Sequence, residues 1–200
     1  MNITSSHLFS FLMLAVVMSA TPGPNNLMVL SSAIRYGTKQ TLGHVSGASA
    51  GSALMLLIVG LGLHQVFMSS HYIQEYMKYL GSAYIIYLAW NILRDSSQLQ
   101  PESASKPMSF LGAVVFQWIN PKSWVMASVA ISTCLPSMFT SLDVSLYAII
   151  FTLVSFPCVG VWAVFGSVIK RYLTNNTLIK TFNMVCAGML FMSAVSMVII

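Results

Sequence analysis

The sequence predicts an all-α integral membrane protein with six transmembrane helices. Of its 200 residues, 56% are hydrophobic and only 6% are charged, which is too few charges to cover a surface in contact with water. The same abundance of apolar residues excludes an intrinsically disordered chain. The uncharged stretches are long and apolar all round, whereas the strands of a membrane barrel would form short alternating segments, so helices are favoured.

Six apolar segments are long enough to cross the hydrocarbon core, which takes about 20 residues of helix. The fourth is made by joining the two uncharged stretches on either side of Lys122. The predicted spans are residues 7–34, 43–67, 76–93, 110–134, 144–169 and 178–198. Because no Lys or Arg precedes the first span, we expect it to be retained rather than cleaved as a signal peptide. The connections are short, so the chain is expected to form one membrane domain.

Basic residues in the connections predict the orientation, because Lys and Arg are enriched in cytoplasmic loops. Only Lys78 lies on the other side. Seven basic residues follow the first, third and fifth spans: Arg35, Lys39, Arg94, Lys106, Lys170, Arg171 and Lys180. Both termini are therefore predicted to lie outside the cytoplasm. The net charge of +5 is interpreted as topology information rather than as a nucleic-acid site, since the basic residues form no patch.

The first span contains a cluster of residues that should break a helix, Thr-Pro-Gly-Pro-Asn-Asn at positions 21–26. Asn25 precedes Arg35 by ten residues, so at about 1.5 Å per residue the break lies near the bilayer midplane. Unpaired backbone at that depth must be buried in protein or line a wet cavity. A single proline would suggest a packing kink, but this cluster favours a binding site that includes Pro22, Gly23, Pro24, Asn25 and Asn26.

The fourth span is interrupted by Asn120, Pro121 and Lys122. A lysine at the midplane costs about 2.5–3.5 kcal/mol and needs a partner or a water-filled cavity. No Asp or Glu falls within any predicted span, which suggests that the missing anion is a substrate carboxylate. The alternative is a lysine that snorkels to the interface. Burial would also favour loss of the Lys122 proton, so Lys122 is a candidate for proton coupling. Asp143, at the outer end of the fifth span, is either a second proton site or a polar cap.

Each predicted break lies in the first helix of a group of three. Since three is odd, the two groups must cross the membrane in opposite directions, which is the inverted-repeat plan of many secondary transporters. Repeat one is predicted at residues 7–93 and repeat two at residues 110–198. In transporters of this plan the substrate binds between the broken helices at the midplane.

Other features have more ordinary interpretations. Gly43, Gly47 and Gly51 lie along one face of the second span and predict close helix packing. Trp118 and Trp124 flank the second break and could form an aromatic wall, a cation–π contact or bundle core.

His44 and His64, near opposite ends of the second span, are either proton relays or packing residues. The cysteines are odd in number and dispersed, so they are expected to be small buried residues rather than a disulfide or metal set: Cys134, Cys158 and Cys186.

Three segments resemble a known family: the motif at positions 21–26, Asn-Pro-Lys at 120–122, and Gly-Ser-Ala-Tyr-Ile-Ile-Tyr-Leu-Ala-Trp at 81–90. The chain resembles the LysE-type amino-acid exporters, the lysine and homoserine/threonine exporter family, over essentially its full length. Residues 120–133 look most like the branch of cysteine and O-acetylserine exporters. Four later residues add to this resemblance: Pro157, Cys158, Trp162 and Gly166. Ser155 and Phe156 depart from the Asn and small apolar residue expected there.

The resemblance implies an efflux protein of the bacterial inner membrane, driven by the proton motive force, whose partners are a small zwitterionic amino acid and the lipid bilayer. It implies functional roles for the residues of both motifs: Pro22, Gly23, Pro24, Asn25, Asn120, Pro121 and Lys122. No cofactor, metal or nucleic acid is expected, and a homo-oligomer is left open. The alternatives are export of another small solute or a metal cation, and, less favoured, a membrane-embedded enzyme, for which the sequence shows no nucleophile with a base.

Overall fold

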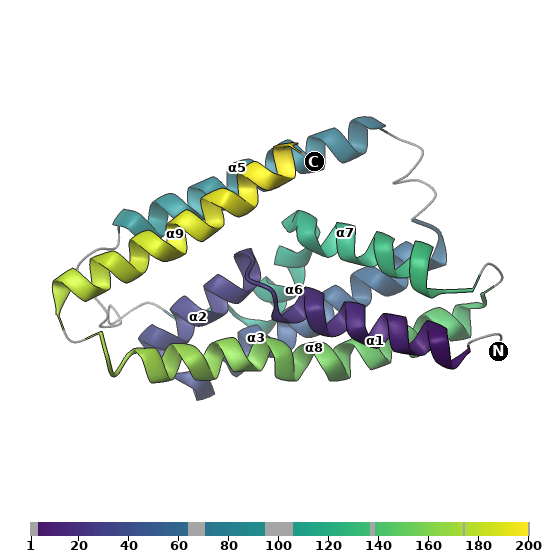
Figure 1. The fold of residues 1–200 in the computed structure, drawn as a ribbon, viewed down its shortest axis with the longest axis horizontal. Coiled ribbons are helices and arrows are strands. Elements are labelled where there is room, and N and C mark those ends of the chain that lie inside the picture. Colours follow the sequence, from purple (N-terminus) through teal and green to yellow (C-terminus); the bar gives the residue numbers. More distant parts are fainter. Residues whose placement is uncertain (1–3, 64–70, 95–105, 137–138, 174, 200) are drawn as a thin grey trace.

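The structure, a computed structural model, describes residues 4–63, 71–94, 106–136, 139–173 and 175–199. All regular structure in these ranges is helical, which confirms the predicted all-α class (Figure 1). The elements are α1 (Ser5–Ala20), α2 (Pro24–Tyr36), α3 (Thr38–Ile58), η1 (Val59–Leu63), α5 (His71–Arg94), α6 (Phe110–Ile119), α7 (Pro121–Val129), η2 (Ala130–Cys134), α8 (Ser141–Ile169) and α9 (Asn176–Ile199).

Both predicted helix breaks are present. α1 and α2 meet at an angle of 51°. Pro24 is the first residue of α2, where the missing N–H of proline costs no helical hydrogen bond. At the second break Asn120 alone separates α6 from α7, and its side-chain oxygen accepts a hydrogen bond from the N–H of Lys122 at 3.2 Å. The backbone therefore changes direction where the local helix chemistry predicts it.

The helices have the length and surface of a multi-pass membrane protein. Among the described residues, three helical segments are long and apolar enough to cross a membrane, Thr38–Gly62, Ser141–Ile169 and Asn176–Val195, and the bent pair α1 and α2 makes a fourth. Large apolar side chains face outward, such as Leu153, which is 70% exposed. Such a surface suits lipid rather than water.

The six-span arrangement is confirmed only in part. α5 has 24 residues, but Gln74, Glu75 and Lys78 lower the hydropathy of its first half. α6 and α7 are each short because the chain breaks between them. These two regions correspond to the predicted third and fourth spans, which stay predictions.

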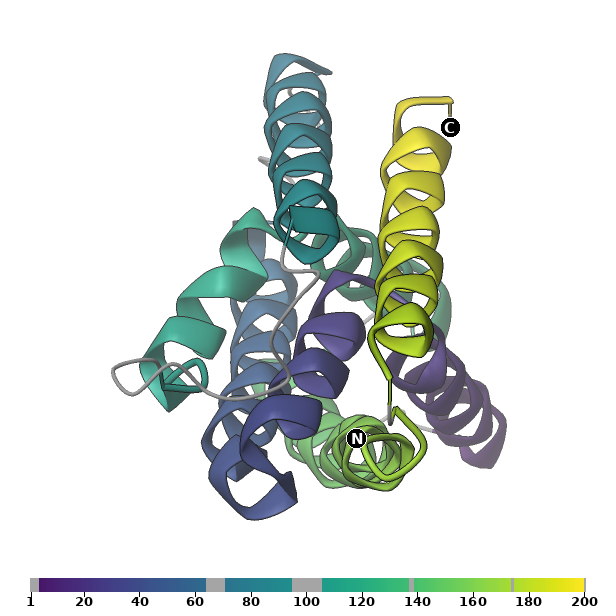
Figure 2. The same cartoon turned by 90° about the vertical axis from the view of Figure 1, so that its left-hand side faces the viewer.

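The helices form a main body and a separate pair. In the main body α3 packs against α8 and α6, while α1 and α2 pack against α8. α5 and α9 lie side by side and project from this body (Figure 2). A buried apolar cluster that includes Leu27, Leu30, Ile85 and Leu190 joins α2 to this pair. A second cluster, in which the rings of Phe11 and Tyr147 lie 4.3 Å apart, holds α1 to α8.

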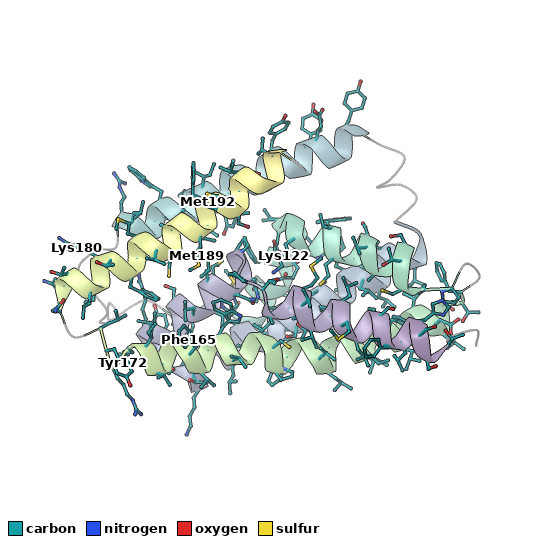
Figure 3. The ribbon with its side chains drawn as sticks, viewed as in Figure 1. Lys122, Phe165, Tyr172, Lys180, Met189 and Met192 are labelled. Atoms are coloured by element: carbon teal, nitrogen blue, oxygen red, sulfur yellow. The ribbon has the colours of Figure 1, made fainter. Side chains whose placement is uncertain are left out.

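Basic residues gather at one end of the molecule. The α2–α3 and α8–α9 connections lie at the end opposite to the N-terminus (Figure 1). There the ammonium of Lys170 donates a hydrogen bond to the backbone oxygen of Arg35 at 3.4 Å. Lys180 lies at the same end (Figure 3). These three residues, all predicted to face the cytoplasm, therefore share one end of the bundle.

Glycines bring α3 close to α6, as predicted. A methyl group on Gly47 would collide with the backbone oxygen of Phe110, and one on Gly51 would lie 2.8 Å from Cα of Val114. At Gly43 the nearest atom would be 3.9 Å away, an ordinary contact. Two of the three glycines are thus required by the approach of the two backbones.

We expect Gly47→Ala to destabilise the protein and Gly43→Ala to leave it nearly unchanged. The added methyl group must push α6 away from α3, and overpacking of this kind costs roughly 1–3 kcal/mol. Thermal unfolding of the two purified variants in detergent measures the difference. Equal midpoints would show that α6 moves freely and that the close approach contributes little to stability.

Candidate functional site

The carboxyl end of α1 is closed by side chains from three other helices. Nδ2 of Asn26 on α2 donates to the backbone oxygens of Ser19 and Thr21, both at 2.8 Å. The indole of Trp162 on α8 donates to the backbone oxygen of Ala20 at 3.2 Å. Nζ of Lys122 on α7 donates to the backbone oxygen of Thr21 at 2.9 Å and to its hydroxyl at 2.8 Å. The carbonyl groups that the break exposes are thereby satisfied.

Lys122 joins the two breaks. Figure 3 places it near the middle of the molecule, far from Lys180 at the end. Its ammonium is bound at the carboxyl end of α1, where the helix dipole carries partial negative charge. The sequence marks no acidic partner for Lys122, and this dipolar partner comes from a segment about a hundred residues away in the chain. In this conformation Lys122 is therefore not an unmatched cation.

Gly23 makes room for the Lys122 side chain. A methyl group on Gly23 would lie 3.1 Å from Cδ and 3.3 Å from Nζ of Lys122. The backbone of Gly23 is extended, with φ −172°, so many residue types could adopt its conformation. Glycine is favoured here by the close approach of the lysine rather than by its backbone angles.

A small polar cavity lies between the breaks, with a volume of about 40 Å³. Five predicted site residues line it: Gly23, Asn25, Asn26, Asn120 and Lys122. Pro22 and Pro24 shape the backbone of the first break, and Pro121 begins α7. The predicted site residues of the two breaks are thus brought to one place, although the two groups are at least 94 positions apart in the sequence.

The two half-helices that begin at the cavity have different amino ends. Asn120 caps α7 with its side chain, but no side chain caps α2. Asn25 and Asn26, which follow Pro24 in the first turn of α2, line the cavity. Backbone N–H groups at such an end, with the positive end of the helix dipole, attract an anion.

A match to a known protein family covers most of the chain. The family model for LysE type translocators matches residues 16–200. The chain belongs to the LysE type translocator family. The resemblance seen at positions 21–26 and 120–122 is therefore confirmed.

Several relatives of this chain are named as efflux proteins. The cysteine/O-acetylserine efflux proteins of Escherichia coli strain K12 and Shigella sonnei strain Ss046 are both 30% identical to it over 131 residues. The match covers 65% of this chain and 66% of theirs, slightly less than two thirds of the relatives' length. No solved structure matches the chain significantly.

The sequence does not single out the central residue of the cavity, Gln117. This side chain is 1% exposed and contacts both breaks. Its Oε1 accepts from Ser123 at 2.7 Å, and its Nε2 donates to Oδ1 of Asn25 at 3.4 Å. The same Oε1 also accepts from Ser52 on α3 at 3.2 Å and from Asn120 at 3.4 Å. The available signal was one amide in the otherwise apolar helix α6, one turn before Asn120.

Serines supply the remaining polar lining. Ser155 on α8 donates to the hydroxyl of Ser49 on α3 at 3.4 Å, and Ser155 lines the cavity. Ser19, also in the lining, has a buried hydroxyl with no partner among the described residues. The departure noted at Ser155 therefore lies in the cavity itself, where it affects the shape and polarity of the site.

We expect Gln117→Leu to abolish transport and destabilise the protein. The substitution keeps the volume but leaves the polar groups around it without this partner, at roughly 1–3 kcal/mol for each buried group that stays unpaired. Gln40→Leu, at an exposed position on α3, is the matched control and should be neutral. Melting temperature and export rate are measured for both. A fully active Gln117→Leu protein would show that the network does not organise the site.

Asp143 lies apart from the cavity and caps a helix. Its Oδ2 accepts from the N–H of Thr140 at 2.9 Å and from the Thr140 hydroxyl at 2.8 Å. The sequence predicts a span that begins at residue 144, but α8 begins at Ser141 because this capping box extends the helix. The structure thus favours the interpretation of Asp143 as a polar cap. A role of Asp143 in proton coupling would have to be tested by a transport assay.

The other candidates have structural surroundings. The rings of Trp118 and Trp124 form an edge-to-face pair 5.8 Å apart, and the Trp124 indole donates to the backbone oxygen of Trp118 at 3.0 Å, which bridges the second break. His44 is fully buried, and neither ring nitrogen has a partner among the described residues. His64 lies outside the described residues.

Cysteines and metal ligands show no cluster in the part of the chain that the structure describes. The three cysteines are free. Cys134 and Cys186 are buried, as expected from the sequence, whereas Cys158 is only half-buried. No group of three or more His, Cys, Asp or Glu side chains is placed to hold a metal ion among these residues.

Proposed function

We propose that this protein exports small zwitterionic amino acids or their derivatives from the cytoplasm across the bacterial inner membrane. The observation that carries the proposal is that two broken helices meet at one buried polar cavity with an ammonium group in its wall. The described lining contains no carboxylate to neutralise Lys122. The family match and the cysteine/O-acetylserine efflux relatives support the same substrate class.

The substrate's two charges fit opposite features of the cavity. Its carboxylate would lie between the Lys122 ammonium and the uncapped amino end of α2. Its ammonium would donate to the amide oxygens of Asn25 and Asn120, which face the same cavity. Metal-cation export is less supported, because an ammonium group at the site repels a cation.

Substrate binding requires the two breaks to move apart. A cavity of about 40 Å³ holds a few water molecules, which is less than an amino acid needs. Lys122 holds the breaks together through Thr21. A substrate carboxylate would compete with Thr21 for the ammonium, and this exchange would release the two half-helices. Binding and opening are thereby coupled at one residue.

The helix packing supports two inverted repeats, residues 7–93 and 110–198. Helices in equivalent positions pair with each other, α3 with α8 and α5 with α9. The broken helix of each half packs against the second helix of the other half, α6 on α3, and α1 and α2 on α8. A two-fold axis in the membrane plane would produce this exchange of partners.

We further propose that the proton motive force drives export. Of the two titratable candidates, Lys122 lines the cavity and Asp143 does not, so Lys122 is the better placed to exchange its proton for substrate. An ammonium that loses its counter-charge when substrate leaves would release a proton more readily.

A panel of isotope-labelled amino acids tests the proposal. Inverted membrane vesicles from cells that produce the protein should accumulate at least one amino acid or derivative, with O-acetylserine included, when a proton gradient is applied. Vesicles from cells without the protein provide the background. If no member of the panel is accumulated, the proposed substrate class is wrong.

The predicted sidedness can be tested with two exposed positions. Ser141 begins α8 near the end that carries the N-terminus, and Thr177 lies in the first turn of α9 at the basic end. In a variant without native cysteines, a membrane-impermeant maleimide should label Ser141→Cys in intact cells and leave Thr177→Cys unlabelled. The reverse pattern would place the termini in the cytoplasm.

A further inference from the structure

A second, larger cavity lies beside the basic end of α2. Its volume is about 390 Å³, and its walls come from α2, α5 and residues 106–108. We call this cavity the vestibule and define it by Arg35 and Ser32 on α2, Asn91 on α5, and Lys106. An amino acid fits this volume, in contrast to the 40 Å³ between the breaks.

The vestibule has the chemistry of a carboxylate site. Arg35 on α2 and Lys106, which precedes α6, line it from different elements. The ammonium of Lys170 is bound to the backbone oxygen of Arg35, so a third cation adds to the positive potential there. Ser32 and Asn91 add a hydroxyl and an amide. A guanidinium group pairs with a carboxylate through two parallel hydrogen bonds, which suits this setting.

One face of α2 connects the vestibule to the cavity between the breaks. Asn25, Met28, Ser32 and Arg35 are spaced by three or four residues, so they form one stripe along the helix. Asn25 lines the inner cavity, while the other three line the vestibule. Ten residues of helix span about 15 Å. Met28, half-buried and with a flexible side chain, lies on the stripe between the two cavities.

We propose that the vestibule is a first binding site for the substrate on the cytoplasmic side, where Arg35 and Lys106 hold its carboxylate before it moves along α2 to Lys122. The inference rests on the proposed export of amino acids. Basic residues at this end also orient the protein in the membrane, and Arg35 and Lys106 in addition line this cavity. A lipid phosphate has related chemistry and is distinguished below.

The first experiment measures uptake of labelled O-acetylserine by inverted vesicles, whose outer surface is the cytoplasmic face. The double variant Arg35→Gln, Lys106→Gln should raise KM about tenfold and change the maximum rate little, because the inner site is intact. Lys39→Gln, Lys180→Gln is the matched control, since it removes two cations from the same end outside the vestibule. Arg35→Lys should keep part of the affinity that the double variant loses, because lysine retains the positive charge but lacks the planar guanidinium group.

The second experiment separates the two sites. In a variant whose native cysteines are replaced, O-acetylserine should protect Ser32→Cys from maleimide, and this protection should persist when Lys122→Met removes the inner site. Loss of protection in the Lys122→Met background would assign all binding to the inner cavity and overturn the proposal.

The remaining outcomes are distinct. An unchanged KM in the double variant, with normal uptake by the parent protein, overturns the vestibule and leaves the exporter intact. No uptake of any amino acid by the parent protein overturns both. If the KM effect appears in liposomes that contain phosphatidylglycerol and disappears in phosphatidylcholine alone, the vestibule binds a lipid headgroup and the proposal is wrong.

Discussion

Lys122→Met should abolish export and weaken substrate binding about 100-fold, which corresponds to roughly 2.8 kcal/mol. Two effects combine in this variant. The substrate carboxylate loses its counter-charge, and the backbone oxygen and hydroxyl of Thr21 lose the donor that holds the two breaks together. Lys122→Arg should also perform badly, because a planar guanidinium does not replace a compact ammonium beside Gly23. Calorimetry of the purified variants measures binding, and vesicle uptake measures export.

Lys180→Met is the control for Lys122→Met, since Lys180 is an exposed lysine at the end of the bundle. Unchanged affinity of Lys122→Met for the amino acid would show that Lys122 only braces the helix breaks. Counterflow exchange compared with proton-driven uptake then tests the coupling role. A Lys122→Met protein that exchanges substrate but ignores a pH gradient would assign the residue to coupling alone.

The double variant Pro22→Ala, Pro24→Ala should insert into the membrane and fail to export. Without the prolines, α1 can continue into α2, and a continuous helix would form its own backbone hydrogen bonds in place of those from Asn26, Trp162 and Lys122. The cavity would lose the uncapped amino end of α2. Export assays at matched protein levels, with binding measured by calorimetry, report the loss.

Pro157→Ala provides the matched control for the two prolines of the break. Pro157 lies inside α8, which runs without interruption from Ser141 to Ile169, and its side chain is exposed. Its replacement should leave export near the parental level. If the double variant of the break transported normally, the motif at positions 21–26 would serve helix packing only.

The contrast between these prolines shows how far local sequence predicts structure. Pro157 is a lone proline, and its helix continues across it. At positions 21–26 two prolines, a glycine and two amides act together, and the helix ends. The break at Asn120 follows the same rule, because an amide that can cap a new helix precedes Pro121. These outcomes depend on neighbours within one turn, which is why the sequence predicts them.

The sequence by itself determined the helical membrane class, both breaks, and the grouping of basic residues at one end, because hydropathy, helix chemistry and charge act over short stretches of chain. Only the tertiary structure decided what the breaks contact. Lys122 binds the carboxyl end of α1, and Gln117 connects Asn25 and Ser52, through hydrogen bonds between distant segments. Such pairings depend on how the helices pack, and a neutral carbonyl or amide partner leaves no charge in the sequence to mark it.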